Sequence, residues 1–363
     1  MKYSKQFAPG TSHPVLKGML HIRSYYEIEE VLMVKYTMDE DQTIKDIKYL
    51  NMISNIYRHR KALQTGTVRS TLENSSSRQL LEAELVRSLK FGVELEVISP
   101  VRSTVILEKM RAVGIDMEAP TRAHETVTGW KLVRDGSIVT SPSCPFSFEI
   151  VSPPQTDFKD LEKVCKVLKE NKIKTNFSTG LHVHHEIKEL KRQQIIRVYE
   201  FYNKYESAID SMLPERRKNN RFCKPIKEVI ETVRSSSTKS SLLKKVAGAG
   251  NTTYYDGCRY YKINLRSFIY YGTIEFRQHH GSIDFEEISN WILFTHKIID
   301  RATQINRNIK PLENERISNN AKITEMVKEL KIENTKLEKN LKTRFEKYGL
   351  LGSSLANSLA SAC

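Results

Sequence analysis

The sequence contains no apolar run near the ~20 residues that a membrane-spanning helix requires, so we expect no membrane span. Residues 1–6 are mostly charged or polar and no apolar segment follows them, which argues against a secretory signal. The five cysteines are scattered and form no CxxC pair. This pattern argues against a zinc ribbon or a disulfide framework and favours a reducing compartment. We therefore expect a cytoplasmic protein.

Two common catalytic signatures are also missing. The phosphate-binding motif GxxxxGK[ST] does not follow any predicted strand, and the glycines at 248 and 250 do not supply it. We find no convincing serine or cysteine triad. Basic residues, by contrast, are in excess: 58 Lys and Arg against 43 Asp and Glu give a net charge of +15. Such a surface attracts nucleic acid, acidic polymers and nucleotides, although many basic proteins bind none of these.

Residues 91–97, with the sequence FGVELEV, predict a buried strand because apolar residues alternate with two glutamates. Successive side chains of a strand point to opposite faces, so Glu94 and Glu96 lie on the same face. Two carboxylates this close repel each other unless solvent, an arginine or a divalent cation separates them. A single pair of this kind is more typical of an exposed sheet face than of a site.

The same pattern recurs along the chain. Residues 180–184 place His182 and His184 on one face of a predicted strand and apolar side chains on the other. Residues 146–151 form a further predicted strand in which Glu149 stands among apolar neighbours. Either histidine could instead belong to a buried, hydrogen-bonded pair, and Glu149 could be an edge residue.

Residues 272–277 complete the set, with Glu275 and Arg277 on one face of a strand. These two could also form a structural ion pair. Four strands with polar inner faces and apolar outer faces predict an α+β protein in which an antiparallel, curved sheet surrounds a polar site. Helices would pack on the outer face of this sheet.

The chain divides into three predicted regions. Residues 1–90 form a helical N-terminal extension, residues 91–305 contain all the strand motifs, and residues 306–363 form a charged helical C-terminal extension with a frayed tail. Within the middle region, the basic loop 214–221 and the serine-rich segment 235–250 are predicted to be mobile loops bordering the substrate entrance.

The ordered motifs resemble the amidoligase family, which comprises carboxylate–amine ligases related to glutamine synthetase and glutamate–cysteine ligase. The resemblance covers about residues 90–300. Five motifs carry it: GVELE at 92–96, Trp130 with DGS at 135–137, FEIVSPP at 148–154, GLHVH at 180–184 and GTIEFR at 272–277. It implies that residues 91–305 form an amidoligase-like catalytic domain, whose sheet is a glutamine-synthetase-like open funnel.

The resemblance also implies cofactors, ATP and Mg²⁺ or Mn²⁺, and roles for individual residues. The implied metal ligands are Glu94, Glu96, Glu149, His182 and Glu275. The residues implied to act on nucleotide phosphate or in catalysis are His184, Arg277 and Arg221. Relatives often carry a further acidic ligand before the position of Glu149, but residues 141–144 supply none. Either Asp135 substitutes for it, or one metal position is weak.

The implied reaction is the ATP-dependent formation of an amide, as a peptide or isopeptide bond, through an acyl phosphate. Clustered glutamates suit Mg²⁺ or Mn²⁺ better than zinc, and phosphoryl transfer depends on positioning and on neutralising charge. The expected partners are a carboxylate and an amine substrate of unidentified structure, with an acidic polymer or nucleic acid possible on the basic surface. Two alternatives stay open at this stage: a metal-dependent hydrolase of nucleic acid, and a catalytically silent binding protein with the same fold.

Overall fold

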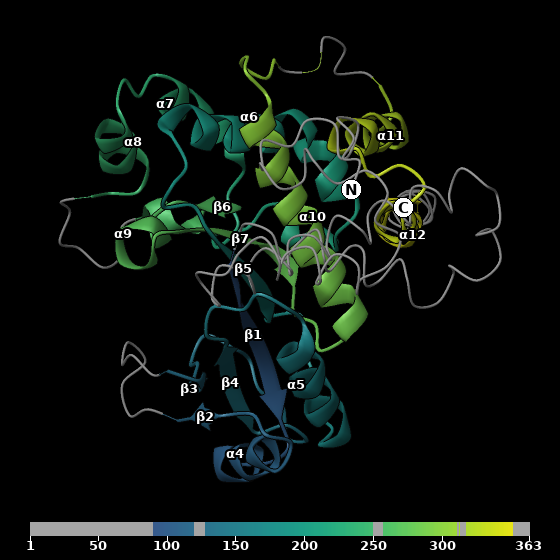
Figure 1. The fold of residues 1–363 in the computed structure, drawn as a ribbon. Coiled ribbons are helices and arrows are strands. Elements are labelled where there is room, and N and C mark those ends of the chain that lie inside the picture. Colours follow the sequence, from purple (N-terminus) through teal and green to yellow (C-terminus); the bar gives the residue numbers. More distant parts are fainter. Residues whose placement is uncertain (1–89, 120–127, 250–256, 311, 313–316, 351–363) are drawn as a thin grey trace, which may run out of the picture. The chain divides into compact units, whose positions relative to one another are not determined.

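The computed structural model describes residues 90–119, 128–249, 257–310, 312 and 317–350 (Figure 1). The predicted N-terminal extension, except for residue 90, and the C-terminal tail after residue 350 lie outside these residues. None of the helices in the described part of the chain combines the length and apolarity needed to cross a bilayer.

Seven strands form one sheet, in the order β2-β3-β4-β1-β5-β7-β6. Their bounds are β1 (Phe91–Ser99), β2 (Met117–Glu118), β3 (Trp130–Arg134), β4 (Phe146–Val151), β5 (Gly180–Glu186), β6 (Ile263–Asn264) and β7 (Thr273–His280). The four strands that carry the polar motifs, β4, β1, β5 and β7, are consecutive neighbours in this order. The prediction that these strands share one sheet is therefore confirmed.

The prediction of a purely antiparallel sheet is wrong. Strands β2 and β3 pair in parallel, through Met117 with Trp130, whereas the other pairs are antiparallel, so the sheet is mixed. In sequence, residues 119–129 separate the two strands, and a parallel pair requires a connection much longer than a two-residue hairpin loop. The α+β class is confirmed, and the open funnel stays a prediction.

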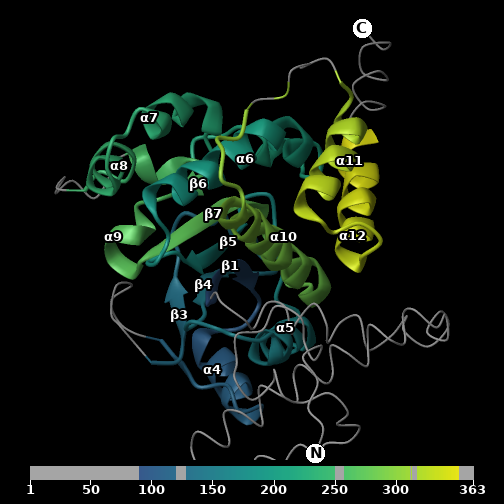
Figure 2. The same ribbon diagram turned by 45° about the horizontal axis from the view of Figure 1, so that its top comes forward.

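The described helices lie between and after the strands. Their bounds are α4 (Ser103–Ala112), α5 (Lys159–Glu170), α6 (Arg192–Ser211), α7 (Ile230–Arg234), α8 (Lys239–Val246), α9 (Ser267–Tyr271), α10 (Phe285–Gln304), α11 (Asn319–Leu330) and α12 (Lys336–Phe345). The two long helices, α6 and α10, pack against each other, and α10 also contacts α5 and β5 (Figure 2).

One face of the sheet is apolar and covered by helices, as the alternating pattern predicts. Leu95, Val183 and Phe276 are fully buried in the main core. The ring of Tyr202 in α6 lies 6.0 Å from that of Phe276 between centroids. His185, which follows the predicted strand motif, also points to this face and its Nε2 lies 2.8 Å from the Thr295 hydroxyl of α10. The polar motif residues therefore occupy the opposite face.

The serine-rich segment 235–250 is not a loop throughout, because α8 occupies its centre. The Thr238 hydroxyl caps this helix by accepting a hydrogen bond from the Ser241 amide at 3.0 Å. Leu242 and Val246 bury its inner face in the core. Local serine content thus predicted a loop where a cap and two buried side chains produce a helix.

The strand predicted at 272–277 begins at Thr273 and is preceded by α9, which residues 267–271 form. Gly272 ends this helix in the left-handed conformation, with φ of 70°. The C-terminal region is helical but not continuous, since Lys331 and Asn334 adopt positive φ angles of 57° and 61° between α11 and α12. Helix α11 packs on α6, so this extension is attached to the strand-bearing region.

Candidate active site

The strand register joins the motif residues across three strand interfaces. The directly opposed pairs are Glu94 with His182, Glu96 with Glu149, and His184 with Glu275. The five predicted metal ligands therefore come together on one face of the sheet, together with His184 and Arg277. Arg221 lies outside this group.

His182 is the residue around which the carboxylates gather. Its Nδ1 lies 2.9 Å from Glu94 Oε2 and 3.5 Å from Glu275 Oε1, and its Nε2 lies 3.6 Å from Glu96 Oε1. The imidazole is almost fully buried, with 6% of its side chain exposed. A single imidazole cannot compensate three carboxylates, so this arrangement concentrates negative charge.

Two groups of three residues could each hold a metal ion, and they share His182. The first comprises Glu94, His182 and Glu275, and the second comprises Glu96, Glu149 and His182. Within each group the ligand atoms lie within 4.8 Å of one another. Carboxylate oxygens predominate, which fits the hard divalent cations Mg²⁺ and Mn²⁺.

Glu149 gives the clearest sign that this face needs a cation. It is partly buried, faces Glu96 across the strand pair, and has no hydrogen-bond or ion-pair partner among the described residues. Burial raises its pKa well above the usual range, and the charges of Glu94 and Glu96 raise it further. A divalent cation between these carboxylates would remove the repulsion that raises this pKa.

Glu94 and His184 form a charged pair beside this group. The Glu94 Oε1 atom lies 3.2 Å from His184 Nε2. Burial favours the neutral carboxyl group of Glu94, but the imidazoles of His184 and His182 outweigh it and hold its pKa well below the usual range. For His184, burial lowers the pKa, yet the charge of Glu94 raises it above its ordinary value. The site therefore favours a protonated His184 while no cation replaces it.

Arg277 donates through Nη1 to Glu275 Oε1, so the ion pair considered from the sequence is present. Burial alone would raise the pKa of Glu275, but the Arg277 charge lowers it below the usual range. Asn264 in β6 donates to the second oxygen of Glu275 at 2.5 Å. The Nε of Arg277 is buried and has no hydrogen-bond partner within the described residues. The guanidinium is therefore fixed on one side and retains a donor that could meet an anion.

A β-bulge places Arg277, and a residue that the sequence analysis missed secures it. The register between β5 and β7 shifts at Leu181 and Val183, which leaves β7 one residue longer than its partner. Arg217 is buried and donates to the carbonyl oxygens of Arg277 at 2.6 Å and Gln278 at 3.0 Å. The only signal for Arg217 in the sequence was its place in the basic loop.

Arg217 also lies close to the carboxylates. A Cβ atom on Gly180 would stand 3.2 Å from Arg217 Nη2 and 3.4 Å from Glu96 Oε2, so only glycine leaves these groups undisturbed. The Gly180 amide itself donates to Glu96 at 2.6 Å. Arg221, from the same loop, is exposed and stacks over the Phe222 ring at 4.5 Å from the centroid. Its catalytic role stays a prediction.

Two further groups escaped the sequence analysis. Lys262 is fully buried, and its ammonium lies 2.8 Å from Glu206 and 2.7 Å from Asp210.

A third possible metal-ligand group comprises His279, His280 and Glu287. Arg344 of α12 already pairs with Glu287 at 2.8 Å, which disfavours a cation there. Single buried polar residues of this kind leave no periodic pattern in a sequence.

Comparison with known proteins gives one family. The chain matches the family described as "putative amidoligase enzyme" over residues 87–299, more than half of its length. A search of curated proteins finds no match. Among solved structures it is similar to a bifunctional glutathione synthetase from Pasteurella multocida, with 12% identity and a TM-score of 0.36. That match covers 75% of this chain but 48% of the other, so the chain spans about half the length of that enzyme. By its family match, the chain belongs to the amidoligase enzymes.

Proposed function

We propose that the protein is an ATP-dependent ligase that joins a carboxylate to an amine through an acyl phosphate. The observation that carries this proposal is the pair of metal-ligand groups sharing His182 on one sheet face, beside the fixed guanidinium of Arg277. Family membership supports the ligase class. The sheet would form the wall of a glutamine-synthetase-like funnel.

The residues present fit a divalent cation. Glu94, His182 and Glu275 would hold one ion, and Glu96 and Glu149 would hold a second with His182 or water. Bound Mg²⁺ or Mn²⁺ would supply neutralisation and orientation of the ATP phosphates. In this arrangement Glu149, which has no partner of its own among the described residues, would gain one.

Arg277 would contact the transferring phosphoryl group. Its Nη1 is held by Glu275 while its Nε remains available. A planar guanidinium can meet two oxygens of a phosphoryl group at once, which an ammonium cannot do as well. His184, whose pKa the charge of Glu94 raises, would donate toward another phosphate oxygen. Arg221 would act at the entrance if its loop closes over the substrate.

The reaction follows from the chemistry of amide formation. Hydroxide is a poor leaving group, so a carboxylate oxygen first takes the terminal phosphoryl group of ATP, which releases ADP. The amine nitrogen then attacks the acyl carbon, the carbon–oxygen bond to phosphate breaks, and the nitrogen loses a proton. The chain's own contribution is to position these groups and to neutralise their charge.

ADP release, measured with mixtures of carboxylates and amines, tests this function. We expect release that requires a divalent cation and both substrates, and that Glu94→Gln abolishes. Added hydroxylamine should intercept the acyl phosphate as a hydroxamate. Metal-dependent cleavage of nucleic acid without ATP would support the hydrolase alternative instead. Absence of any turnover, with unchanged ligand binding in Glu94→Gln, would support the silent binding protein.

A further inference from the structure

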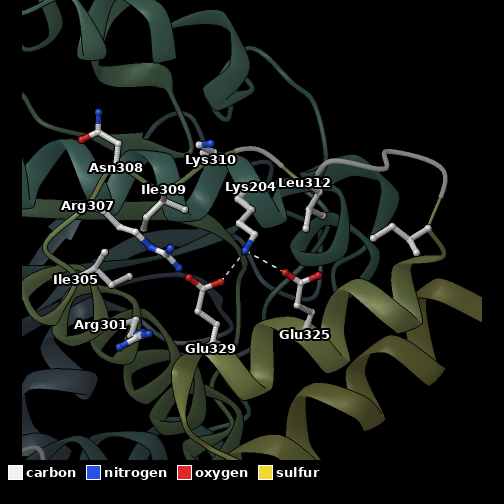
Figure 3. Close-up of a pocket in the computed structure, with 11 residues that line it drawn as sticks. Lys204, Arg301, Ile305, Arg307, Asn308, Ile309, Lys310, Leu312, Glu325 and Glu329 are labelled. Carbon is white, nitrogen blue, oxygen red and sulfur yellow. Dashed lines mark hydrogen bonds and ion pairs between the residues drawn. The ribbon is translucent and has the colours of Figure 1, made fainter.

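A pocket of about 550 Å³ lies between α6, the end of α10, the segment that follows α10, and α11 (Figure 3). No residue of the candidate active site lines it. Six charged residues do: Lys204, Arg301, Arg307, Lys310, Glu325 and Glu329. Helices α6 and α10 of the strand-bearing region and helix α11 of the C-terminal extension all contribute to its lining.

The pocket carries an excess of positive charge. Four of the six charged residues are cations, and the two carboxylates can compensate at most two of them. Lys204 lies between both carboxylates, 3.0 Å from Glu325 and 2.8 Å from Glu329 (Figure 3). Glu329 also accepts a hydrogen bond from the Tyr205 hydroxyl at 2.6 Å. The carboxylates are therefore well occupied, and within the described lining of the pocket two positive charges have no carboxylate to compensate them.

Arg301 gives a second, independent indication. Its side chain is partly buried and lines the pocket, and its Nε has no hydrogen-bond partner among the residues that the structure describes. Buried N–H donors are nearly always satisfied in native proteins. An acceptor from a bound molecule would satisfy this one, and an anionic acceptor would form the stronger, charge-assisted bond.

The pocket also has an apolar side, formed in part by Ile305 and Ile309, which are buried. Its volume lies within the range of small-molecule sites, roughly 300 to 1,000 Å³. We propose that this pocket binds a small organic anion with at least two negative charges, carried by phosphate or carboxylate groups. Arg301, Arg307 and Lys310 bind the anionic groups, and the isoleucines contact the rest of the molecule.

Calorimetric titration of the full chain in metal-free buffer at fixed ionic strength tests this site. Pyrophosphate and citrate serve as probes, because they separate a preference for phosphate from one for carboxylate. Arg277 of the candidate active site also has a donor that could meet an anion, so the titration is repeated with Arg277→Gln, which should leave the binding unchanged. We expect saturable binding of at least one probe at a single site.

Variants then locate the binding. Arg301→Gln with Arg307→Gln should weaken it by about 10-fold or more, the usual effect of losing hydrogen bonds to charged groups. The double variant Arg307→Gln with Lys310→Gln changes only exposed residues. It tests whether the anion binds in this pocket if the first variant fails to fold. The matched control is Arg111→Gln with Arg134→Gln, two exposed arginines outside the pocket.

The possible results differ clearly. Loss of binding in the pocket variants with unchanged binding in the control supports the site. An equal loss in the control would show diffuse attraction to a basic surface and overturn it, as would unsaturable binding or unchanged binding in the pocket variants. Glu94→Gln should leave this metal-free binding intact, so failure of the proposed ligase function would not affect the outcome.

Discussion

Glu149→Gln should have opposite effects on stability without and with a divalent cation. In the metal-free protein the Glu149 and Glu96 ligand oxygens lie within 4.8 Å of each other. Two unit charges at that distance repel by roughly 3 kcal/mol at an effective dielectric constant near 20. Glu149 avoids part of this cost by binding a proton, as its raised pKa indicates. Glutamine removes the charge and should raise the free energy of unfolding by about 1–2 kcal/mol.

The pH dependence of this effect has a definite sign. Because folding raises the pKa of Glu149, this carboxyl group binds more protons in the folded than in the unfolded protein. Its contribution to the stability of the wild type therefore falls as pH rises above the ordinary carboxyl range. The advantage of the variant should therefore vanish below about pH 4 and grow toward neutral pH. A gain of this size corresponds to roughly 2–6 °C in melting temperature.

Scanning calorimetry with and without Mn²⁺ measures both effects. A cation at 100 times its Kd should stabilise the wild type by about 2.7 kcal/mol, and Glu149→Gln should lose most of this gain. Glu189→Gln, at an exposed position, is the matched control and should change neither value. A metal-free variant less stable than the wild type would show that Glu149 has a structural partner, and the argument for a cation at this position would fail.

Three further predictions concern the same site. Arg277→Lys should retain metal binding in calorimetry but lose turnover on the order of 10²-fold; full turnover would make the arginine a structural partner only. Arg217→Lys removes the guanidinium that binds the two backbone carbonyl oxygens at the β-bulge, so it should lower the melting temperature. Arg221→Lys, at an exposed position, should not, and equal effects of the two substitutions would contradict the role of Arg217 in holding the bulge. The stability that His184 gains from Glu94 should be complete below about pH 6.5 and lost as pH rises through the raised folded pKa of His184. Denaturant titration of the metal-free protein over this pH range measures the free energy of unfolding, with Glu94→Gln as the reference. An equal pH dependence in Glu94→Gln would show that the pair of His184 and Glu94 does not produce it.

The sequence by itself determined which side chains share a face. A strand alternates its side chains by covalent geometry, so Glu94 with Glu96, His182 with His184, and Glu275 with Arg277 could be placed together without knowledge of the fold. The ordered motifs around these residues also indicated the family, which the match over residues 87–299 confirms.

Only the tertiary structure decided which of these faces meet. Glu94 pairs with His182 across 88 positions of sequence, and this register depends on core packing and backbone hydrogen bonds that no local pattern encodes. The same holds for the bulge at Arg277 and for Arg217, which reaches it from a loop 60 positions away. Helix α8 forms where the serine content predicted a loop. Its residues Leu242 and Val246 are buried in the core, which the local composition does not reveal. The alternation of side chains along each strand thus determined which residues share a face, whereas long-range packing determined which strands meet to form the site.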